Sequence, residues 1–308
     1  MKDRYKEVRK LNPKIAIGSW AFAFGPFASS PWSLTQILQY AQDAGFKGIE
    51  INGFAPHPTP ESHPTRESRL ELLREIESYG LGISGYAPDF TSIPPAIVDE
   101  ERYLERLRDY IDFSRDLGIT TIRVDTVSPP EYLDEEKYEE RFQRLAKTWR
   151  ASGTLAYEAG MQIVWEFEPG FWLNKPSEVK RMVEKVNHPA FQVLFDTSHA
   201  YMSGVVGARQ VGKKELLSGG ITEYARLLSK HIGHFHLIDS DGTLHDEETS
   251  THAAFGAGHI DFREILAELK PIIGNMEWWC VDFCFNAEVE EWGRQSVSFI
   301  QEQIREVD

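Results

Sequence analysis

The sequence of 308 residues lacks several features that mark whole classes of protein. It has only two cysteines, Cys280 and Cys284, too few for a disulfide framework and wrongly spaced for the paired pattern of a structural zinc site. No apolar run approaches the roughly 18 residues that would span a membrane, and the first ten residues contain no apolar leader segment. We therefore expect a cytoplasmic protein that works in a reducing compartment and has no membrane partner.

Positive charge is also scarce, with 33 Lys and Arg against 48 Asp and Glu and a formal net charge of −15. Phosphate backbones and anionic membranes select basic surfaces, so nucleic acid is not an expected partner. Hydrophobic residues make up 41% of the chain and charged residues 26%, which is ordinary for a globular protein with a large core.

Short β-branched runs alternate with longer amphipathic stretches along the whole chain. The predicted strands are residues 14–18, 48–51, 82–86, 120–124, 162–165, 191–195, 231–237 and 278–283. The predicted helices are residues 35–44, 68–79, 100–117, 138–159, 177–186, 221–228, 262–269 and 288–304. Four of these helices stop at a glycine that suits a left-handed cap, namely Gly45, Gly80, Gly118 and Gly160.

Eight strand–helix units with nearly continuous apolar strands predict an α/β fold, a single (β/α)8 barrel domain over residues 1–308. The alternative is an open doubly wound sheet, but no Gly-x-Gly-x-x-Gly turn follows the first strand. The longer loops all follow strands, so we expect the active site at the C-terminal face of the barrel.

Polar side chains gather where the last four predicted strands end. Because side chains alternate along a strand, the outer member of each pair can reach the barrel mouth, which brings together Glu168, Asp196, His236 and Asp282. Three carboxylates and one imidazole suit a single divalent ion such as Mn²⁺, Mg²⁺, Co²⁺ or Zn²⁺ with positions left open for substrate. Glu166 and His234 lie one pleat deeper, where supporting roles are expected.

The whole chain resembles the xylose isomerase-like TIM barrel superfamily, which includes tagatose epimerases and inosose dehydratases. The resemblance is carried by residues 41–50, by Phe167-Glu-Pro169, by Asp196-Thr-Ser-His199, and by Gly233-His-Phe-His236 followed by Gly256-Ala-Gly-His-Ile-Asp261. It implies that Glu168, Asp196 and His236 bind a metal, that Asp282 takes the place of a fourth ligand that is usually Glu, and that His199 binds substrate.

The resemblance also implies catalytic roles for Glu168, Asp282 and His199, because the two strand-end carboxylates of the epimerases act as bases on opposite faces of the substrate. Asp282 is one methylene shorter than the usual Glu, which weakens the case for a symmetric pair of bases. The arginine that epimerases carry shortly after the strand-seven histidine is absent from residues 238–242.

Further substrate contacts are expected from the loops that surround the mouth. Arg123 and Asp125 share one face at the end of the fourth strand, either as an internal ion pair or as substrate ligands. His252 lies in a long polar segment that we expect to fold over the mouth, and Trp20 follows the first strand, where it either packs the rim or forms a wall for a sugar ring.

Four functions remain open. The first is a metal-dependent isomerase or epimerase that removes a proton beside the carbonyl of a sugar or polyol and forms an enediolate; the second is a lyase or dehydratase that uses the same site. The third is an endonuclease relative, which the acidic charge disfavours, and the fourth is a sugar-binding barrel without catalysis. The identity of the sugar, its phosphorylation and the formation of a homo-oligomer are not fixed by the sequence.

Overall fold

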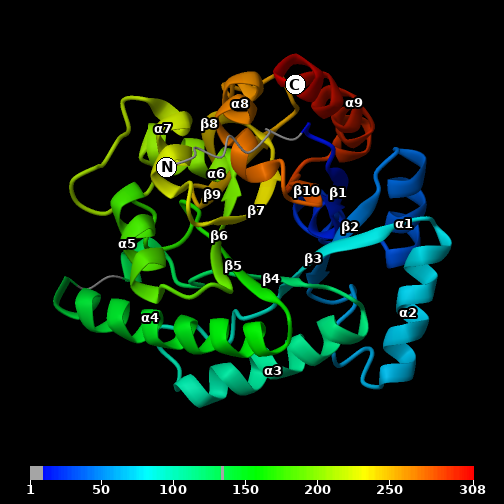
Figure 1. The fold of residues 1–308 in the computed structure, drawn as a ribbon, viewed down its shortest axis with the longest axis horizontal. Helices are drawn as coiled ribbons and strands as arrows, with labels where there is room; N and C mark the ends of the chain where they lie inside the picture. Colours follow the sequence, from blue (N-terminus) through cyan, green and yellow to red (C-terminus); the bar gives the residue numbers. More distant parts are fainter. Residues whose placement is uncertain (1–9, 133–134) are drawn as a thin grey trace, which may run out of the picture.

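Eight parallel strands close into a barrel in the order β1-β10-β7-β6-β5-β4-β3-β2 (Figure 1). The computed structural model describes residues 10–132 and 135–308. The strands are β1 (Lys14–Gly18), β2 (Gly48–Gly53), β3 (Gly82–Pro88), β4 (Thr121–Val124), β5 (Gln162–Glu166), β6 (Phe191–Asp196), β7 (Ile232–Leu237) and β10 (Trp278–Val281). Each falls on a predicted apolar run, so the predicted closed barrel is confirmed and the open sheet is excluded.

Helices surround the barrel, and they match the predicted amphipathic stretches within a few residues at either end (Figure 1). They are α1 (Leu34–Asp43), α2 (Arg66–Ser78), α3 (Glu100–Asp116), α4 (Glu135–Glu158), α5 (Pro176–Val186), α7 (Gly220–Leu228), α8 (Phe262–Ile273) and α9 (Val289–Val307), with a short α6 (Thr197–Tyr201) directly after β6. Gly45, Gly80, Gly118 and Gly160 have φ angles of 86°, 69°, 69° and 73°, as left-handed caps require. Within residues 10–132 and 135–308, no helix combines the length and the apolar character needed to cross a membrane.

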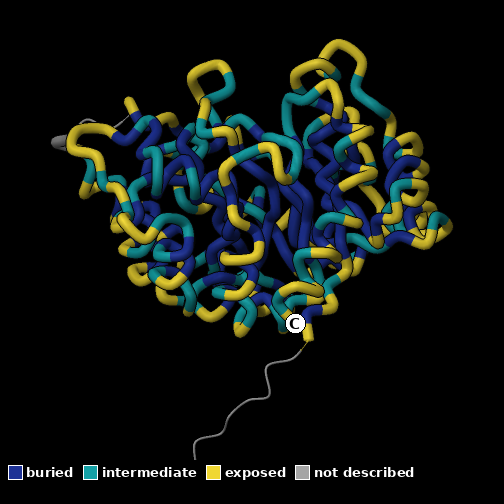
Figure 2. The backbone as a smooth tube through the Cα atoms, turned by 90° about the horizontal axis from the view of Figure 1, so that it is seen from above, coloured by how far each residue is buried: buried dark blue, intermediate teal, exposed yellow. Residues whose placement is uncertain are grey.

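The core lies between the strands and the helix ring, where the backbone is buried, while the exposed segments lie around it (Figure 2). Large aromatic side chains fill this layer: Trp149 of α4 packs against Trp165 of β5 and Phe191 of β6, with ring centroids 5.0 and 5.2 Å apart. The strands are therefore covered by apolar helix faces, and the polar strand ends at the barrel mouth are the part of the barrel left for chemistry.

A second, small sheet follows β7, where the sequence predicts only a polar loop. Strands β8 (Asp239–His245) and β9 (Thr249–Ala253) form an antiparallel hairpin outside the barrel. The buried carboxylate of Asp239 accepts hydrogen bonds from the backbone N–H groups of Gly256, Gly258 and Ile260 at 2.9, 3.0 and 3.1 Å. This carboxylate ties the base of the hairpin to the segment that leads into α8.

Candidate metal centre

Four buried side chains from four neighbouring strands bring ligand atoms to one point at the barrel mouth. Glu166 ends β5, Asp196 ends β6, His236 lies in β7, and Asp282 is the first residue after β10. Each offers one nitrogen or oxygen, and these atoms all lie within 4.8 Å of one another. Strand pairing fixes the arrangement, since Asp196 is opposite His236 and the Asp282 N–H donates to the Leu237 carbonyl at 3.1 Å.

The ligand atoms in this group lack other partners, which is the observation that fits a cation. Glu166 Oε1, Asp196 Oδ2 and His236 Nδ1 are buried without a hydrogen bond. His236 Nδ1 lies 3.2 Å from Glu166 Oε1 and 3.7 Å from Asp282 Oδ2. Because buried polar atoms in folded proteins are nearly always paired, three such atoms directed at one point fit a bound divalent ion.

Electrostatics within the group lead to the same conclusion. Burial, together with the charges of Asp282 and Glu166, raises the pKa of Asp196 well above its usual range. Burial also opposes ionisation of Glu166, but the neighbouring Arg123 and His236 hold the pKa of that carboxyl below its ordinary value. Carboxylates forced this close repel one another, and a divalent cation between them would remove the repulsion.

A further acidic residue orients the histidine ligand from below. Glu50 of β2 is buried, and its Oε1 lies 3.2 Å from His236 Nε2 while its Oε2 lies 2.8 Å from His234 Nε2. His236 therefore keeps Nδ1 directed at the ligand group, as outer-shell carboxylates do for metal-binding histidines. His234 has the supporting contact that was expected, whereas Glu50 was missed. A single carboxylate inside the apolar strand 48–51 was the signal for it.

The β5 glutamate that lies in this group is not the one that the sequence pattern predicts as a metal ligand. The sequence pattern predicts Glu168 as the β5 ligand and Glu166 as a deeper supporting residue, but Glu166 is the carboxylate that joins Asp196, His236 and Asp282. The physical reason is that β5 ends at Glu166, so strand alternation no longer governs the direction of Glu168. Beyond the strand the chain turns, with the Phe171 N–H donating to the Glu168 carbonyl at 3.2 Å.

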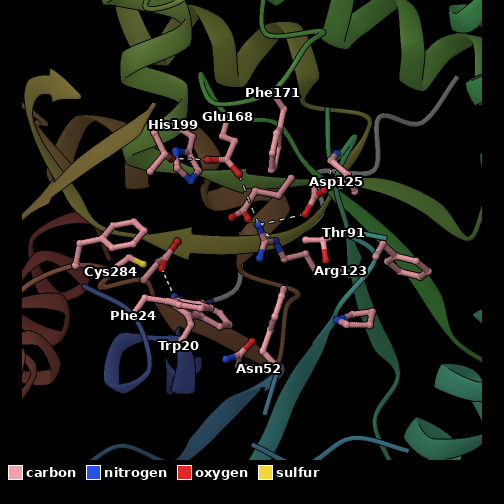
Figure 3. Close-up of a pocket in the computed structure, with 18 of the residues that line it drawn as sticks. Trp20, Phe24, Asn52, Thr91, Arg123, Asp125, Glu168, Phe171, His199 and Cys284 are labelled. Carbon is pink, nitrogen blue, oxygen red and sulfur yellow. Dashed lines mark hydrogen bonds and ion pairs between the residues drawn. The ribbon is translucent and has the colours of Figure 1, made fainter. Parts of the chain in front are cut away.

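The ligand group opens into a cavity of about 230 Å³ (Figure 3). All the residues predicted as catalytic or substrate-binding line it, namely Trp20, Arg123, Asp125, Glu168, His199, His252 and Asp282. Phe24, Phe54, Phe90, Phe171 and Phe285 supply apolar walls. The Trp20 indole N–H donates to Asp282 Oδ1, so this ring fixes a member of the ligand group as well as lining the cavity.

Arg123 links the ligand group to the outer part of the cavity. Its guanidinium pairs with Glu166, and its Nη2 lies 3.7 Å from Asp125 Oδ2 and 3.9 Å from Glu168 Oε1. The predicted internal pair with Asp125 is therefore present. Burial raises the pKa of Asp125 to about 6 and that of Glu168 to about 7, with the attraction of Arg123 opposing both shifts. Glu168 thus lines the cavity as a carboxyl group outside the ligand set.

The β8–β9 hairpin closes one side of the cavity with the predicted His252 and with Thr249 and Ser250, which the sequence did not single out. Ser250 Oγ lies 2.8 Å from His199 Nδ1, and the Thr249 hydroxyl donates to Glu168 Oε2. His252 of the same strand reaches the cavity beside Asp282, with 3.9 Å between His252 Nδ1 and Asp282 Oδ1. Burial lowers the pKa of His252 to about 4. Polar alternation in residues 249–253 was the available signal for this strand.

Comparison with known proteins places this geometry in a family. Inosose dehydratase from Bacillus licheniformis is 25% identical over 257 residues, which cover 77% of this chain and 76% of that protein. Two solved structures share the fold, both at a TM-score of 0.71. A probable 3-DHS dehydratase, AsbF, from Bacillus anthracis is 17% identical, with 94% of this chain and 98% of that one covered. A D-tagatose 3-epimerase-like protein is 21% identical, with coverage of 96% and 98%. The model of the xylose isomerase-like TIM barrel family matches residues 38–303, and the chain belongs to that family.

Proposed function

We propose that this protein is a divalent-metal-dependent dehydratase that removes a proton beside the carbonyl of an oxo-polyol and eliminates water. The observation that carries the proposal is the group of unpartnered ligand atoms on Glu166, Asp196 and His236, which adjoins, through Glu166 and Asp282, a cavity lined by further charged side chains. A divalent ion held by these residues and Asp282 would stabilise the negative charge that forms on the carbonyl oxygen when the proton leaves.

The other side chains of the cavity bind the substrate, transfer the proton and exclude water. Arg123 and Asp125 offer donors and acceptors to substrate hydroxyls in the outer part of the cavity. Glu168 is the proton-transfer group, because it lines the cavity, lies outside the ligand group and is fixed by the Thr249 hydroxyl. His199 is oriented by Ser250 and faces the substrate cavity from the hairpin side. The phenylalanine walls keep water away from the reacting atoms.

Elimination is favoured over epimerisation by the asymmetry of these groups. Epimerisation needs two equivalent bases on opposite faces of the substrate, but Asp282 Oδ1 already accepts the Trp20 indole N–H. Asp282 is also one methylene shorter than the glutamate that is usual in epimerases. The sequence relative described above is an inosose dehydratase, which supports an oxo-polyol as the substrate class.

A sugar isomerase or epimerase is the second candidate. It is supported by one observation: Glu166 and Asp282 both line the cavity, so each has access to a bound substrate. In that case the same proton would be removed but then returned to the carbon skeleton, with no leaving group lost.

Proton NMR of the reaction in D₂O tests the proposal and separates the two candidates. We expect Mn²⁺-loaded protein to convert an inosose into a product that has lost one water, and chelator-treated protein to be inactive until Mn²⁺ is restored. Solvent deuterium in a skeleton of unchanged formula would instead establish the second candidate. If the metal-loaded protein turned over neither inososes nor ketohexoses, the proposed function would be wrong.

A further inference from the structure

A second group of ligand atoms lies beside the first and shares one residue with it. His199, His252 and Asp282 are all buried, and each offers an atom within 4.8 Å of the others. We propose that this group binds a second divalent cation, with the Asp282 carboxylate bridging the two ions. The inference rests on the proposed function, because it assumes that the first group is a metal site.

The unpaired ring of His252 is independent evidence that this second group binds a cation. Its side chain is only 3% exposed, yet neither ring nitrogen has a hydrogen-bond partner. A neutral imidazole carries one donor and one acceptor, so a buried ring with both unused is costly unless something else fills the acceptor position. A cation between His252 and Asp282 would use that lone pair.

The two oxygens of Asp282 face the two groups separately. Oδ2 lies 3.7 Å from His236 Nδ1 in the first group, and Oδ1 lies 3.9 Å from His252 Nδ1 in the second. Oδ1 also accepts the Trp20 indole N–H, but a carboxylate oxygen has a second lone pair for a metal. One carboxylate can therefore serve both ions, as in sites whose two metals lie about 3.5–4 Å apart.

The hairpin positions both histidines of the second group. Ser250 and His252 alternate along β9, so their side chains share one face of the strand. The Ser250 hydroxyl engages His199 Nδ1 at 2.8 Å, which fixes the ring and leaves Nε2 as the atom for a ligand. This contact resembles the hydrogen bond that orients a metal-binding imidazole through its other nitrogen.

The negative charge around the cavity is large enough to be balanced by a second cation. Five carboxylates gather at the mouth, those of Asp125, Glu166, Glu168, Asp196 and Asp282, and the Arg123 guanidinium contacts three of them, Asp125, Glu166 and Glu168. With all five ionised, one divalent ion and one guanidinium balance three negative charges, and a second divalent ion would balance the other two. Two imidazoles and a carboxylate favour Mn²⁺, Co²⁺ or Zn²⁺ over the oxygen-seeking Mg²⁺ and Ca²⁺.

Metal counting on the full chain tests this inference. After treatment with a chelator, the protein is dialysed to equilibrium against Mn²⁺, and bound Mn²⁺ is measured by elemental analysis and by electron paramagnetic resonance. We expect two Mn²⁺ per chain with a spin-coupled signal in the wild type, and one Mn²⁺ with an uncoupled signal in His252→Phe. His245→Phe, the same change on the same hairpin, should still bind two, because His245 instead contacts Asp246 and stacks on Phe285.

A milder variant protects the test against misfolding. Ser250→Ala removes the contact that orients His199 without removing a ligand, so the second Mn²⁺ should bind about 10–100-fold more weakly while the first is unchanged. A wild type that binds one Mn²⁺ at saturation, or a His252→Phe protein that still binds two, would overturn the inference and leave the proposed function in place. A wild type that binds none would overturn both.

Discussion

At the scale of single residues, two glutamates at the end of β5 have separate roles. Glu166 has a buried, unpartnered oxygen in the ligand group, whereas Glu168 faces the cavity and is held by Thr249 and Arg123. We therefore predict that Glu166→Gln weakens Mn²⁺ binding by at least about 10–100-fold. Glu168→Gln should keep Mn²⁺ binding and lower kcat by about 10²–10⁴-fold, the usual contribution of a positioned acid or base.

Calorimetric titration with Mn²⁺ and initial-rate kinetics on the two variants check this prediction. Each variant is the control for the other, because both replace a carboxylate by an amide at the end of β5. If Glu168→Gln lost the metal and Glu166→Gln kept it, the assignment of the ligand would have to be reversed.

The sequence predicts that Asp196, His236 and Asp282 lie together at the barrel mouth, as they do in the structure, but it places Glu166 one pleat deeper. Asp196, His236 and Asp282 lie within or directly after their strands, where counting along the alternation works. The prediction of Glu168 as a ligand follows the Glu-Pro pair at 168–169, whereas β5 ends at Glu166, a boundary that depends on backbone hydrogen bonds that composition does not reveal. The contact between Glu50 and the two histidines joins residues 184 and 186 positions apart, so only the closed barrel brings them together.

At the scale of elements, the β8–β9 hairpin completes the site from outside the barrel. Its base depends on Asp239, whose buried carboxylate accepts the N–H of its neighbour Ser240 and three backbone N–H groups from beyond the hairpin. A Cβ at Gly258 would lie 2.3 Å from that carboxylate. Asp239→Ala would leave these donors without a partner at about 1 kcal/mol or more each. We predict amide exchange in residues 239–260 about 100-fold faster, together with a loss of activity.

Hydrogen-exchange mass spectrometry checks this prediction, with Asp241→Ala as the control. Asp241 lies in the same strand, but its exposed carboxylate accepts hydrogen bonds from Thr243 two residues along. Exchange in β5 and β6 should stay unchanged in both variants. Equal protection of the hairpin in Asp239→Ala and in the wild type would show that this carboxylate does not hold the hairpin.

The barrel elements could be predicted because short apolar strand runs alternate with amphipathic helix patterns and because glycines mark the ends of four helices. The β8–β9 hairpin could not be predicted in this way. Residues 239–253 are mostly polar, and their Asp-Gly pair, Asp241-Gly242, lies within β8 and not at the turn between β8 and β9. Asp246 and Glu247 adopt positive φ angles of 50° and 61° in that turn. This left-handed conformation is routine for glycine, so neither residue predicts a turn here. The contacts of the hairpin with the barrel mouth, rather than its own sequence pattern, explain its position.

At the scale of the whole molecule, a metal in the first group would join four of the eight strands, β5, β6, β7 and β10. An ion bound only by the folded chain adds about 2.7 kcal/mol when its concentration is 100 times its Kd. At an unfolding entropy of about 2.1 cal/mol/K per residue, a chain of 308 residues should lose about 4 °C in Tm on chelation. Calorimetry with and without Mn²⁺ measures this, and Glu166→Gln, the control, should show little Mn²⁺ dependence.

The net charge of −15 gives a second prediction for the whole molecule. Since nucleic-acid binding depends on neutralising phosphates with Lys and Arg, we predict no binding or cleavage of abasic duplex DNA at physiological salt, with or without Mn²⁺. A mobility-shift and nicking assay checks this. Metal-dependent cleavage would favour the endonuclease alternative despite the acidic charge.

The most direct test of the central claim is anomalous diffraction at the manganese edge from crystals grown with Mn²⁺. We predict a peak within coordination distance of Glu166, Asp196, His236 and Asp282, with Glu168 outside the ligand set. A map with no peak at this point, or with a peak coordinated by Glu168 in place of Glu166, would contradict it.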